Sequence, residues 1–207
     1  YPVTLSTVSL TRTVTVQYAA AGGTATPGLD YTAAAGTLTY APGEFRKVIP
    51  IQAVDDTLDE EDTEPFTFTL SAPVNATLGL ASEPTSIYDN DPPPGARTED
   101  TVVVEGNAPG PRCTFPITLS VPSALTVRLA YETEDATAHP GQDYQPVSGW
   151  LTFAPGDLAR EVEVALLPDG VPEDNESFQL HLIGGDHVTI VVFRGTCTIL
   201  DDDVAPI

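Results

Sequence analysis

The chain repeats itself over its whole length. Tyr1-Pro-Val-Thr-Leu-Ser6 matches Phe115-Pro-Ile-Thr-Leu-Ser120, and Asp89-Asn90-Asp91 matches Asp201-Asp202-Asp203. Matching residues are separated by 112 to 114 positions. A period this long belongs to whole domains in tandem, because the repeats of solenoids are only about 20–50 residues long. The repeat therefore predicts two copies of one domain of about 100 residues.

A proline run marks the boundary between the copies. Pro92-Pro93-Pro94-Gly95 forms a stiff segment, because the pyrrolidine rings fix the backbone angle φ. We expect a first domain over residues 1–91, a Pro-rich linker over 92–98 and a second domain over 99–207. The chain contains no Met, so we also expect it to be a processed or excised piece of a longer protein.

Apolar residues recur at every second position within each copy. Residues 14–18 and 66–70 show this alternation in the first copy, and residues 125–131 and 178–182 show it in the second. A period of two is typical of a β-strand with one buried face, and Gly, Pro and Asp turns separate the segments. No segment carries a helical stripe. The pattern predicts an all-β fold of two tandem immunoglobulin-like, seven-stranded β-sandwiches.

The strong acidity of the chain excludes several partners. There are 30 Asp plus Glu against 8 Lys plus Arg, which gives a net charge of −22. Such a surface repels polyanions, so we do not expect nucleic acid as a partner. No apolar run approaches the roughly 18–20 residues of a membrane span, so we do not expect membrane insertion.

The carboxylates gather in runs that recur in both copies. Residues 55–64 and 169–176 each follow an apolar alternation, and an acidic triplet closes each copy. Strand ends meet at the two ends of a sandwich, where converging carboxylates repel one another unless a cation lies among them. An all-oxygen ligand set favours Ca²⁺ over Mg²⁺ and disfavours zinc and copper. Taken one at a time, such Asp residues also occur as ordinary turn and cap residues.

Four motifs in this order resemble the Calx-beta module. Gly-x-Asp-Tyr ends at Tyr31 and again at Tyr144, and Gly-x-Leu-x-Phe/Tyr-x-Pro-Gly ends at Gly43 and again at Gly156. The acidic run and the closing Asp-x-Asp follow in each copy. The resemblance covers nearly the whole chain twice. It implies a sandwich that binds several Ca²⁺ ions at the end where the last strand exits.

The resemblance also implies the calcium ligands. In the second copy they are Glu105, Asp143, Asp169, the carbonyl of Val171, Glu173, Glu176, Asp201, Asp202 and Asp203. In the first copy they are Asp30, Asp55, Asp56, the carbonyl of Leu58, Glu60, Glu64, Asp89 and Asp91. Pro168 replaces an Asp of the family pattern, which costs the second copy one ligand. An extra residue near Thr63 leaves open whether Asp62 replaces Glu64.

The first copy lacks the strand that opens the second. Thr101-Val-Val-Val-Glu105 precedes the strand of Phe115, whereas the counterpart of Phe115 is Tyr1. Two explanations stay open. The sequence begins inside the domain, or a neighbouring copy of the chain donates the strand, which would build a head-to-tail filament and supply the missing Glu-like ligand.

Cys113 and Cys197 both lie in the second copy. Two cysteines in a chain of extracellular character suggest a disulfide. It would close an 84-residue loop and stabilise the fold by about 4 kcal/mol on the chain-entropy model. A pair of buried free thiols is the alternative.

Three functions compete. The first is a calcium-binding structural module of an extracellular fibre, adhesin or surface protein, in which Ca²⁺ rigidifies both domains and their joint. The second is a regulatory calcium-sensor pair of a larger membrane or signalling protein, as Calx-beta domains are in sodium/calcium exchangers. The third is an enzyme, which we do not expect because the three His residues accompany no recognisable nucleophile motif. The Thr-rich, Lys-poor composition and the paired cysteines favour the structural role and a secreted or cell-surface location.

Overall fold

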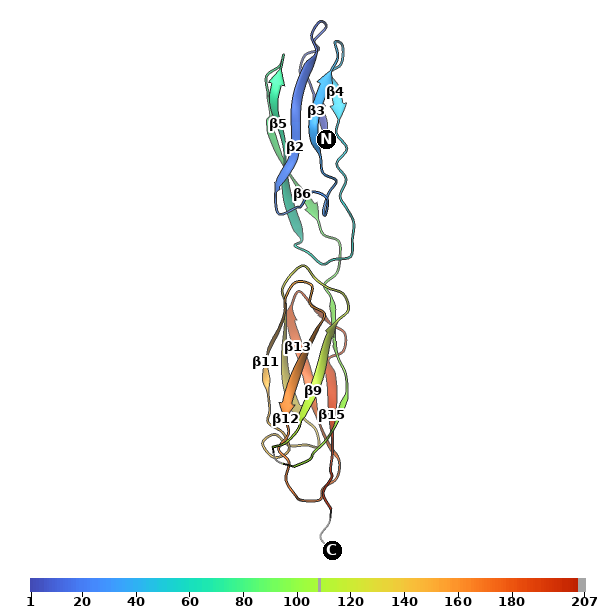
Figure 1. Ribbon diagram of the computed structural model, residues 1–207, viewed down its shortest axis with the longest axis vertical. Coiled ribbons are helices and arrows are strands. Elements are labelled where there is room, and N and C mark those ends of the chain that lie inside the picture. Colours follow the sequence, from blue (N-terminus) through green and yellow to red (C-terminus); the bar gives the residue numbers. More distant parts are fainter. Residues whose placement is uncertain (108, 205–207) are drawn as a thin grey trace. The chain divides into compact units, whose positions relative to one another are not determined.

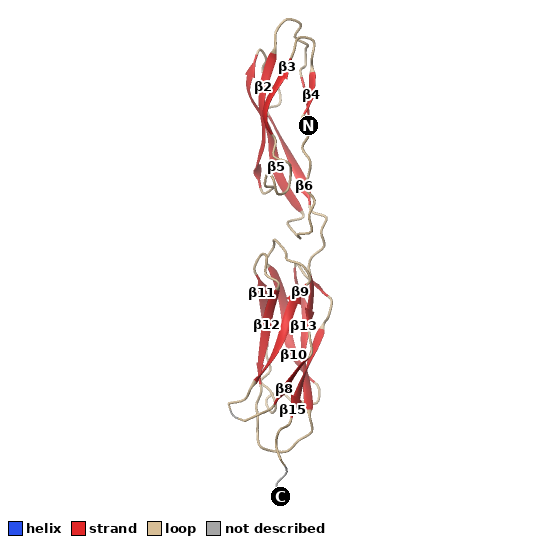
Figure 2. Cartoon of the chain, turned by 45° about the vertical axis from the view of Figure 1, so that its right-hand side comes forward, coloured by secondary structure: helices blue, strands red, loops and turns tan. Residues whose placement is uncertain are grey.

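The computed structural model describes residues 1–107 and 109–204, and these form strands and loops (Figure 2). Contacts divide the chain into two compact units, one made of residues 1–57 and 61–90 and the other of 58–60 and 91–207. By sequence, residues 58–60 belong to the first copy. The predicted all-β class is confirmed. Among the described residues, none belongs to a helix with the length and apolarity needed to cross a membrane.

The first unit has six strands in two sheets (Figure 1). The smaller sheet pairs β1 (Pro2–Thr4) with β4 (Arg46–Val48). The larger sheet has the order β3-β2-β5-β6 and consists of β2 (Val14–Gly23), β3 (Ala35–Tyr40), β5 (Thr63–Val74) and β6 (Ser82–Tyr88). Both β1 and β6 are edge strands with a single neighbour.

The second unit has one five-stranded and one four-stranded sheet. One has the order β11-β10-β13-β15-β8, and the other has the order β12-β9-β7-β14. Their strands are β7 (Gly95–Thr98), β8 (Thr101–Val104), β9 (Arg112–Leu119), β10 (Val127–Asp135), β11 (Ser148–Phe153), β12 (Ala159–Ala165), β13 (Glu176–Asp186), β14 (Thr189–Ile190) and β15 (Arg194–Leu200).

The first strand of the second unit is split between its two sheets. Its first half, β7, pairs antiparallel with β9, and its second half, β8, pairs parallel with β15. With β7 and β8 counted as one strand and the two-residue β14 set aside, the second unit has the predicted seven strands. The first unit has six, and what it lacks is the counterpart of β7 and β8.

The expectation of a linker through residue 98 is wrong. Residues 95–98 form β7, in which Ala96 lies opposite Leu119 and Thr98 lies opposite Ile117. Ala96 is 0% and Thr98 is 3% exposed. These two small side chains alternate with outward-facing polar ones, so the segment is a short strand, and the linker shortens to the three prolines.

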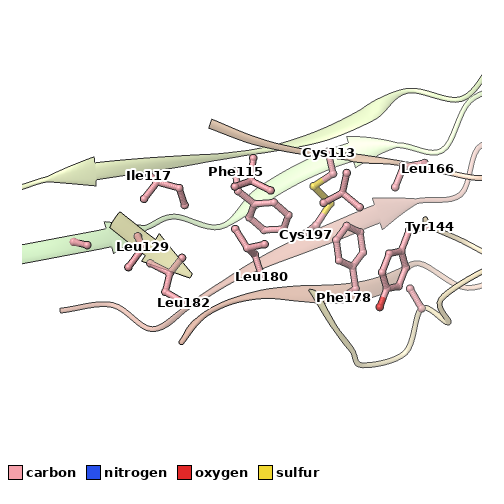
Figure 3. Close-up of a cluster of buried hydrophobic side chains, with 14 of the residues drawn as sticks. Cys113, Phe115, Ile117, Leu129, Tyr144, Leu166, Phe178, Leu180, Leu182 and Cys197 are labelled. Atoms are coloured by element: carbon pink, nitrogen blue, oxygen red, sulfur yellow. A yellow bond between two sulfur atoms is a disulfide. The ribbon is translucent and has the colours of Figure 1, made fainter. Parts of the chain in front are cut away.

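A disulfide joins the two sheets of the second unit. Cys113 of β9 and Cys197 of β15 are bonded across the core, which decides between the disulfide and the free thiols (Figure 3). Beside them Phe115 meets Phe178 edge-on at 5.8 Å between ring centroids, and Tyr144 stacks on Phe178 at 4.1 Å. Aromatic contacts of this kind stabilise a core beyond their buried area.

Candidate metal centre

The Gly-x-Asp-Tyr motif builds the same tight turn in both copies. The tyrosine is buried, at 0% exposure for Tyr31 and 1% for Tyr144, and its carbonyl accepts a hydrogen bond from the N–H of the motif glycine. That glycine, Gly28 or Gly141, has a positive φ, which favours Gly over any residue with a Cβ. The buried ring therefore fixes the aspartate just before it at the end of the sandwich.

One oxygen of that aspartate closes the turn. Asp143 Oδ2 accepts a hydrogen bond of 2.6 Å from the His139 N–H, and Asp30 Oδ2 accepts the equivalent bond from the Thr26 N–H. An aspartate that hydrogen-bonds its own turn is common in loops without any metal. In both turns, however, the carboxylate also meets two glutamates from another segment.

In the second copy, the first carboxylate cluster follows the ends of two paired strands. Glu105 comes directly after β8, and Asp201 and Asp203 come directly after β15. One ligand atom of each lies within 4.8 Å of the others. The parallel pairing of β8 with β15 continues as a bond from the Glu105 N–H to the Leu200 carbonyl. Glu105 is only 8% exposed.

The second cluster combines the aspartate turn with the start of β13. Asp143, Glu173 and Glu176 each offer one ligand atom, and these atoms also lie within 4.8 Å of one another. A cavity of about 10 Å³ joins the two clusters, since Glu105 and Asp201 line it together with the second set. A cavity of this volume holds about one water-sized sphere.

Burial, and then the neighbouring negative charges, raise the pKa values of several carboxyl groups in the two clusters. The pKa of Glu176 rises to about 7, first because burial disfavours its charged form and then because of the hydrogen bond and the charge of Asp143. Burial also raises the pKa of Glu105, against a hydrogen bond from the Asp169 N–H, and the charges of Asp169 and Asp203 add to the rise. Both clusters of the second copy are therefore electrostatically strained when every carboxylate is charged.

The first copy contains one such cluster. Asp30, Glu60 and Glu64 offer ligand atoms within 4.8 Å of one another, and they correspond to the Asp143, Glu173 and Glu176 set. Burial raises the pKa of Glu64, and the charge and hydrogen bond of Asp30 raise it further. Among the described residues, the cluster built on Glu105 has no three-carboxylate counterpart in the first copy.

Nine of the implied ligands thus lie in three clusters, and the remaining eight lie outside them. The eight are Asp55, Asp56, Leu58, Asp89, Asp91, Asp169, Val171 and Asp202. Asp169 lies against the first cluster of the second copy, since its N–H donates to Glu105 Oε1 at 3.1 Å and its Oδ1 accepts from the Val171 N–H. Asp202 Oδ1 accepts a bond of 2.8 Å from the Gly106 N–H, which holds the loop after β8 in place. Ca²⁺ binding by the individual residues stays a prediction.

Two residues of the second site lie outside the implied ligand set. Asp174 lines the cavity between the clusters. The Asn175 side-chain oxygen accepts a bond of 3.1 Å from the Asp201 N–H and so positions that aspartate. Both belong to the acidic run of residues 169–176, but the sequence does not reveal which members of a run point toward the cavity.

The donor set fits a hard divalent cation of the size of Ca²⁺. All ligand atoms are carboxylate oxygens, and their mutual distances of up to 4.8 Å suit one ion with Ca–O distances of about 2.3–2.6 Å. In addition, Asp203 Oδ2 is buried and has no hydrogen-bond partner among the described residues. A buried carboxylate oxygen without a partner costs free energy unless a cation lies beside it.

Comparisons with known proteins identify the domain family of both copies. The family model described as "Calx-beta domain" matches residues 2–91 and 112–203. Sodium/calcium exchanger 1 of Rattus norvegicus is 33% identical over 101 residues, which cover 40% of this chain and 10% of that protein. Adhesion G-protein coupled receptor V1 of Danio rerio is 27% identical over 199 residues, which cover 86% of this chain and 3% of the receptor.

Among solved structures, the apo-form Calx CBD1 domain has a TM-score of 0.49 and 27% identity, with 54% of this chain and 99% of that chain covered. By contrast, the chain matches only a small part of the length of the two curated relatives named above.

Proposed function

Because the chain belongs to the Calx-beta domain family over both of its copies, we propose that it is a pair of Ca²⁺-binding domains that regulates a larger protein. The observation that carries this proposal is the convergence of two three-carboxylate clusters on one small cavity in the second copy. Five of their six carboxylates line this cavity together with Asp174, and such a set matches the oxygen-rich coordination that Ca²⁺ requires.

Calcium binding changes the balance of forces in the second site. Without the ion, the charges of the two clusters repel one another, and protonation of groups such as Glu176 relieves the strain. With Ca²⁺ bound at both clusters, the charges at the end of β15 and in residues 169–176 are balanced and no longer repel one another. The loop that carries Glu173 is therefore the segment whose order responds to the calcium concentration.

A regulatory role is supported by the relatives. Sodium/calcium exchanger 1 contains the related segment as a tenth of its length, and sodium/calcium exchanger 2 of Rattus norvegicus is 28% identical over 185 residues, which cover 81% of this chain. The related segment is in each case part of a much longer protein. By similarity, this pair of domains reports the calcium concentration to other parts of its parent protein.

The calcium dissociation constant tests this role. Isothermal titration of the chain with Ca²⁺ should give values between about 10⁻⁷ and 10⁻⁵ M, the range of calcium sensors, and not about 10⁻⁴–10⁻³ M, the range of extracellular modules. Glu176→Gln should weaken binding at least about tenfold, because it removes one charged ligand of a cluster. The matched control Glu161→Gln changes an exposed carboxylate of β12 outside the implied ligand set and outside the three clusters, and should leave binding unchanged.

A second candidate role is favoured by the disulfide. The Cys113–Cys197 bond is typical of proteins in oxidising compartments, and one relative is an adhesion receptor by name. In this role the chain is a calcium-stiffened, extracellular segment of a surface protein or fibre, without enzymatic activity. Bound Ca²⁺ would then hold the joint, because Asp89 and Asp91 directly precede the linker prolines. A dissociation constant in the weaker range would favour this role.

A further inference from the structure

The loop between β12 and β13 contains an Asp-Gly pair. Asp169 and Gly170 are both exposed, and no other Asp or Asn in the sequence is followed by Gly. The same loop continues to Glu173 and leads into Glu176, two members of the second carboxylate cluster. A chemical change in the main chain at this pair therefore alters the segment that brings carboxylates to the metal centre.

Hydrogen bonds hold the chain up to Asp169 and leave the next nitrogen accessible. The Leu167 N–H donates to the Asp143 carbonyl at 2.9 Å, and the Asp169 N–H donates to Glu105 Oε1 at 3.1 Å. Within the described part of the chain, the Gly170 N–H donates no hydrogen bond. A Cβ at Gly170 would meet no atom within 4 Å, apart from those of its two chain neighbours. The Gly170 nitrogen is therefore neither paired nor covered.

A second hydrogen bond positions the Asp169 carboxyl group. Asp169 Oδ1 accepts a bond of 2.7 Å from the Val171 N–H. This bond to the residue two positions further on folds the aspartate side chain back over the peptide group of Gly170. The Val171 N–H also withdraws electron density from the carboxyl group. Both effects favour attack of the Gly170 nitrogen on Asp169 Cγ.

We propose that Asp169 is a modification site, which converts to isoaspartate without an enzyme and with water as the sole co-reactant. The Gly170 nitrogen forms a bond to Asp169 Cγ and loses its hydrogen, while the carboxyl group loses its hydroxyl. One water leaves, and a cyclic succinimide remains. Water then cleaves one of the two C–N bonds of the ring. Cleavage of the new bond restores aspartate, whereas cleavage of the original peptide bond leaves the chain linked through Cγ. No atom is oxidised or reduced.

The first copy has a residue that opposes this reaction. Asp56 and Thr57 stand at the positions of Asp169 and Gly170. Threonine carries two heavy atoms on Cβ, and these crowd the nitrogen that would attack. Glycine has no Cβ and also allows the chain a wider range of backbone angles. The two copies should therefore differ in this chemistry although their acidic loops correspond.

Isoaspartate would change the metal centre of the second copy, and this consequence rests on the proposed function. The modified residue keeps its charge, but the main chain gains one methylene group ahead of Gly170. The segment that carries Glu173 is then displaced relative to Asp143, its partner in the second cluster. Bound Ca²⁺ would restrain this segment, so the calcium-free chain is the form that reacts. The modification thus records time spent without calcium.

Peptide mapping of the aged chain tests the site. The whole chain is kept in warm, neutral buffer with a chelator and a stabilising osmolyte, which favours the folded state, and circular dichroism confirms that it stays folded. Chromatography with mass spectrometry then separates isoaspartyl peptides, which have unchanged mass, from succinimide peptides, which are lighter by one water. We expect both products in the peptide that spans Asp169 and neither in the peptide that spans Asp56. Equal amounts at the two positions would overturn the proposal.

A free peptide tests whether the loop geometry favours the reaction. Folding usually slows this reaction, because it holds the carboxyl group away from the nitrogen. A synthetic peptide of residues 166–173 has the same sequence without the fold. We expect Asp169 to react at least as fast in the folded chain as in this peptide. A folded chain that reacts much more slowly, or not at all, would show that the loop protects Asp169 and would contradict the proposal.

Substitution of the glycine tests the role of its nitrogen. Gly170→Val places a β-branched side chain where there is space for it, and it should abolish isoaspartate formation at Asp169. The matched control Gly79→Val makes the same change at an exposed loop glycine of the first copy that also has open space around it. This control should leave the reaction at Asp169 unchanged. Undiminished reaction in the Gly170→Val chain would refute the mechanism.

Calcium completes the test. Saturating Ca²⁺ should slow isoaspartate formation at Asp169, and the aged chain should bind Ca²⁺ more weakly in its second copy than the fresh chain. Equal rates with and without Ca²⁺ would overturn the link to calcium and leave the modification site standing. A chain that shows no calcium binding by isothermal titration, yet forms isoaspartate at Asp169, would contradict the proposed function instead.

Discussion

The two copies carry nearly the same motifs, yet they differ in how much of a metal centre they build. Both form the aspartate turn and bring two glutamates to it. Among the described residues, the second copy alone has the strand that brings Glu105 to Asp201 and Asp203, and it alone has a disulfide. An acidic loop therefore provides charge, but a paired strand that ends at the right place turns this charge into a compact cluster.

Removal of the disulfide should have the largest effect, because it destabilises the second unit and leaves the first unit unchanged. Replacement of Cys113 and Cys197 by Ala should lower the free energy of unfolding of the second unit by about 4 kcal/mol, through loss of an 84-residue cross-linked loop. Trp150 is the only tryptophan and lies in the second unit, so denaturation followed by tryptophan fluorescence measures this unit. A reducing agent should leave the first unit unchanged, because it contains no cysteine. A shift of both units would contradict the local effect of the bond.

Removal of calcium should have the second largest effect, by lowering the stability of the two copies to different extents. Each ion that binds only the folded state stabilises it by about 2.7 kcal/mol when free calcium is 100 times the dissociation constant. The second copy has two clusters and the first has one, so a chelator should lower the melting temperature of the second unit more. Differential scanning calorimetry with and without chelator measures both transitions. Equal shifts would show that the number of clusters does not determine calcium-dependent stability.

The turn aspartates allow a matched comparison between the copies. Asp143→Asn and Asp30→Asn each remove one ligand charge and keep an oxygen that can accept the turn hydrogen bond. We expect each change to weaken calcium binding about tenfold at its own cluster and to leave the other copy unaffected. Calcium titrations of the two variants test this. Loss of binding in both copies from one substitution would mean that the sites are coupled.

The pH dependence of the calcium-free protein should be a smaller effect. The folded-state pKa of Glu176 is raised from 4.5 to about 7, and those of Glu105, Glu173 and Asp203 are also raised. The folded state then holds more protons than the unfolded chain, so the free energy of unfolding should fall as pH rises from about 4.5 to about 7. Thermal unfolding in chelator at several pH values measures this slope. A rising stability over that interval would contradict the crowding of carboxylates, and saturating Ca²⁺ should flatten the slope.

Much of this architecture could be predicted from the sequence, because its signals are periodic and local. The repeat gave two domains, the alternation gave strands, and the position of Phe115 relative to Tyr1 revealed the missing strand. The boundary at residue 98 could not be read correctly, because Ala96 and Thr98 are small and their burial depends on pairing with β9. Short strands next to prolines carry too little periodicity to be distinguished from linkers.

The site was predicted only at the level of its segments. The sequence placed the acidic runs at strand ends, but an acidic loop has no periodicity that tells which carboxylates turn inward. Glu173 and Glu176 lie in a cluster, while Asp55 and Asp56 lie outside all three. Asn175 could not be recognised as a positioning residue, since its bond to the Asp201 N–H joins segments 26 residues apart.

The location of bound calcium tests the central claim most directly. A crystal structure of the chain grown with Ca²⁺, with anomalous diffraction to identify the ions, would show every occupied site. We predict ions coordinated by Glu105, Asp201 and Asp203, and by Asp143, Glu173 and Glu176, in the second copy, and by Asp30, Glu60 and Glu64 in the first. Crystals with millimolar Ca²⁺ and no ion at any of these clusters would contradict the account.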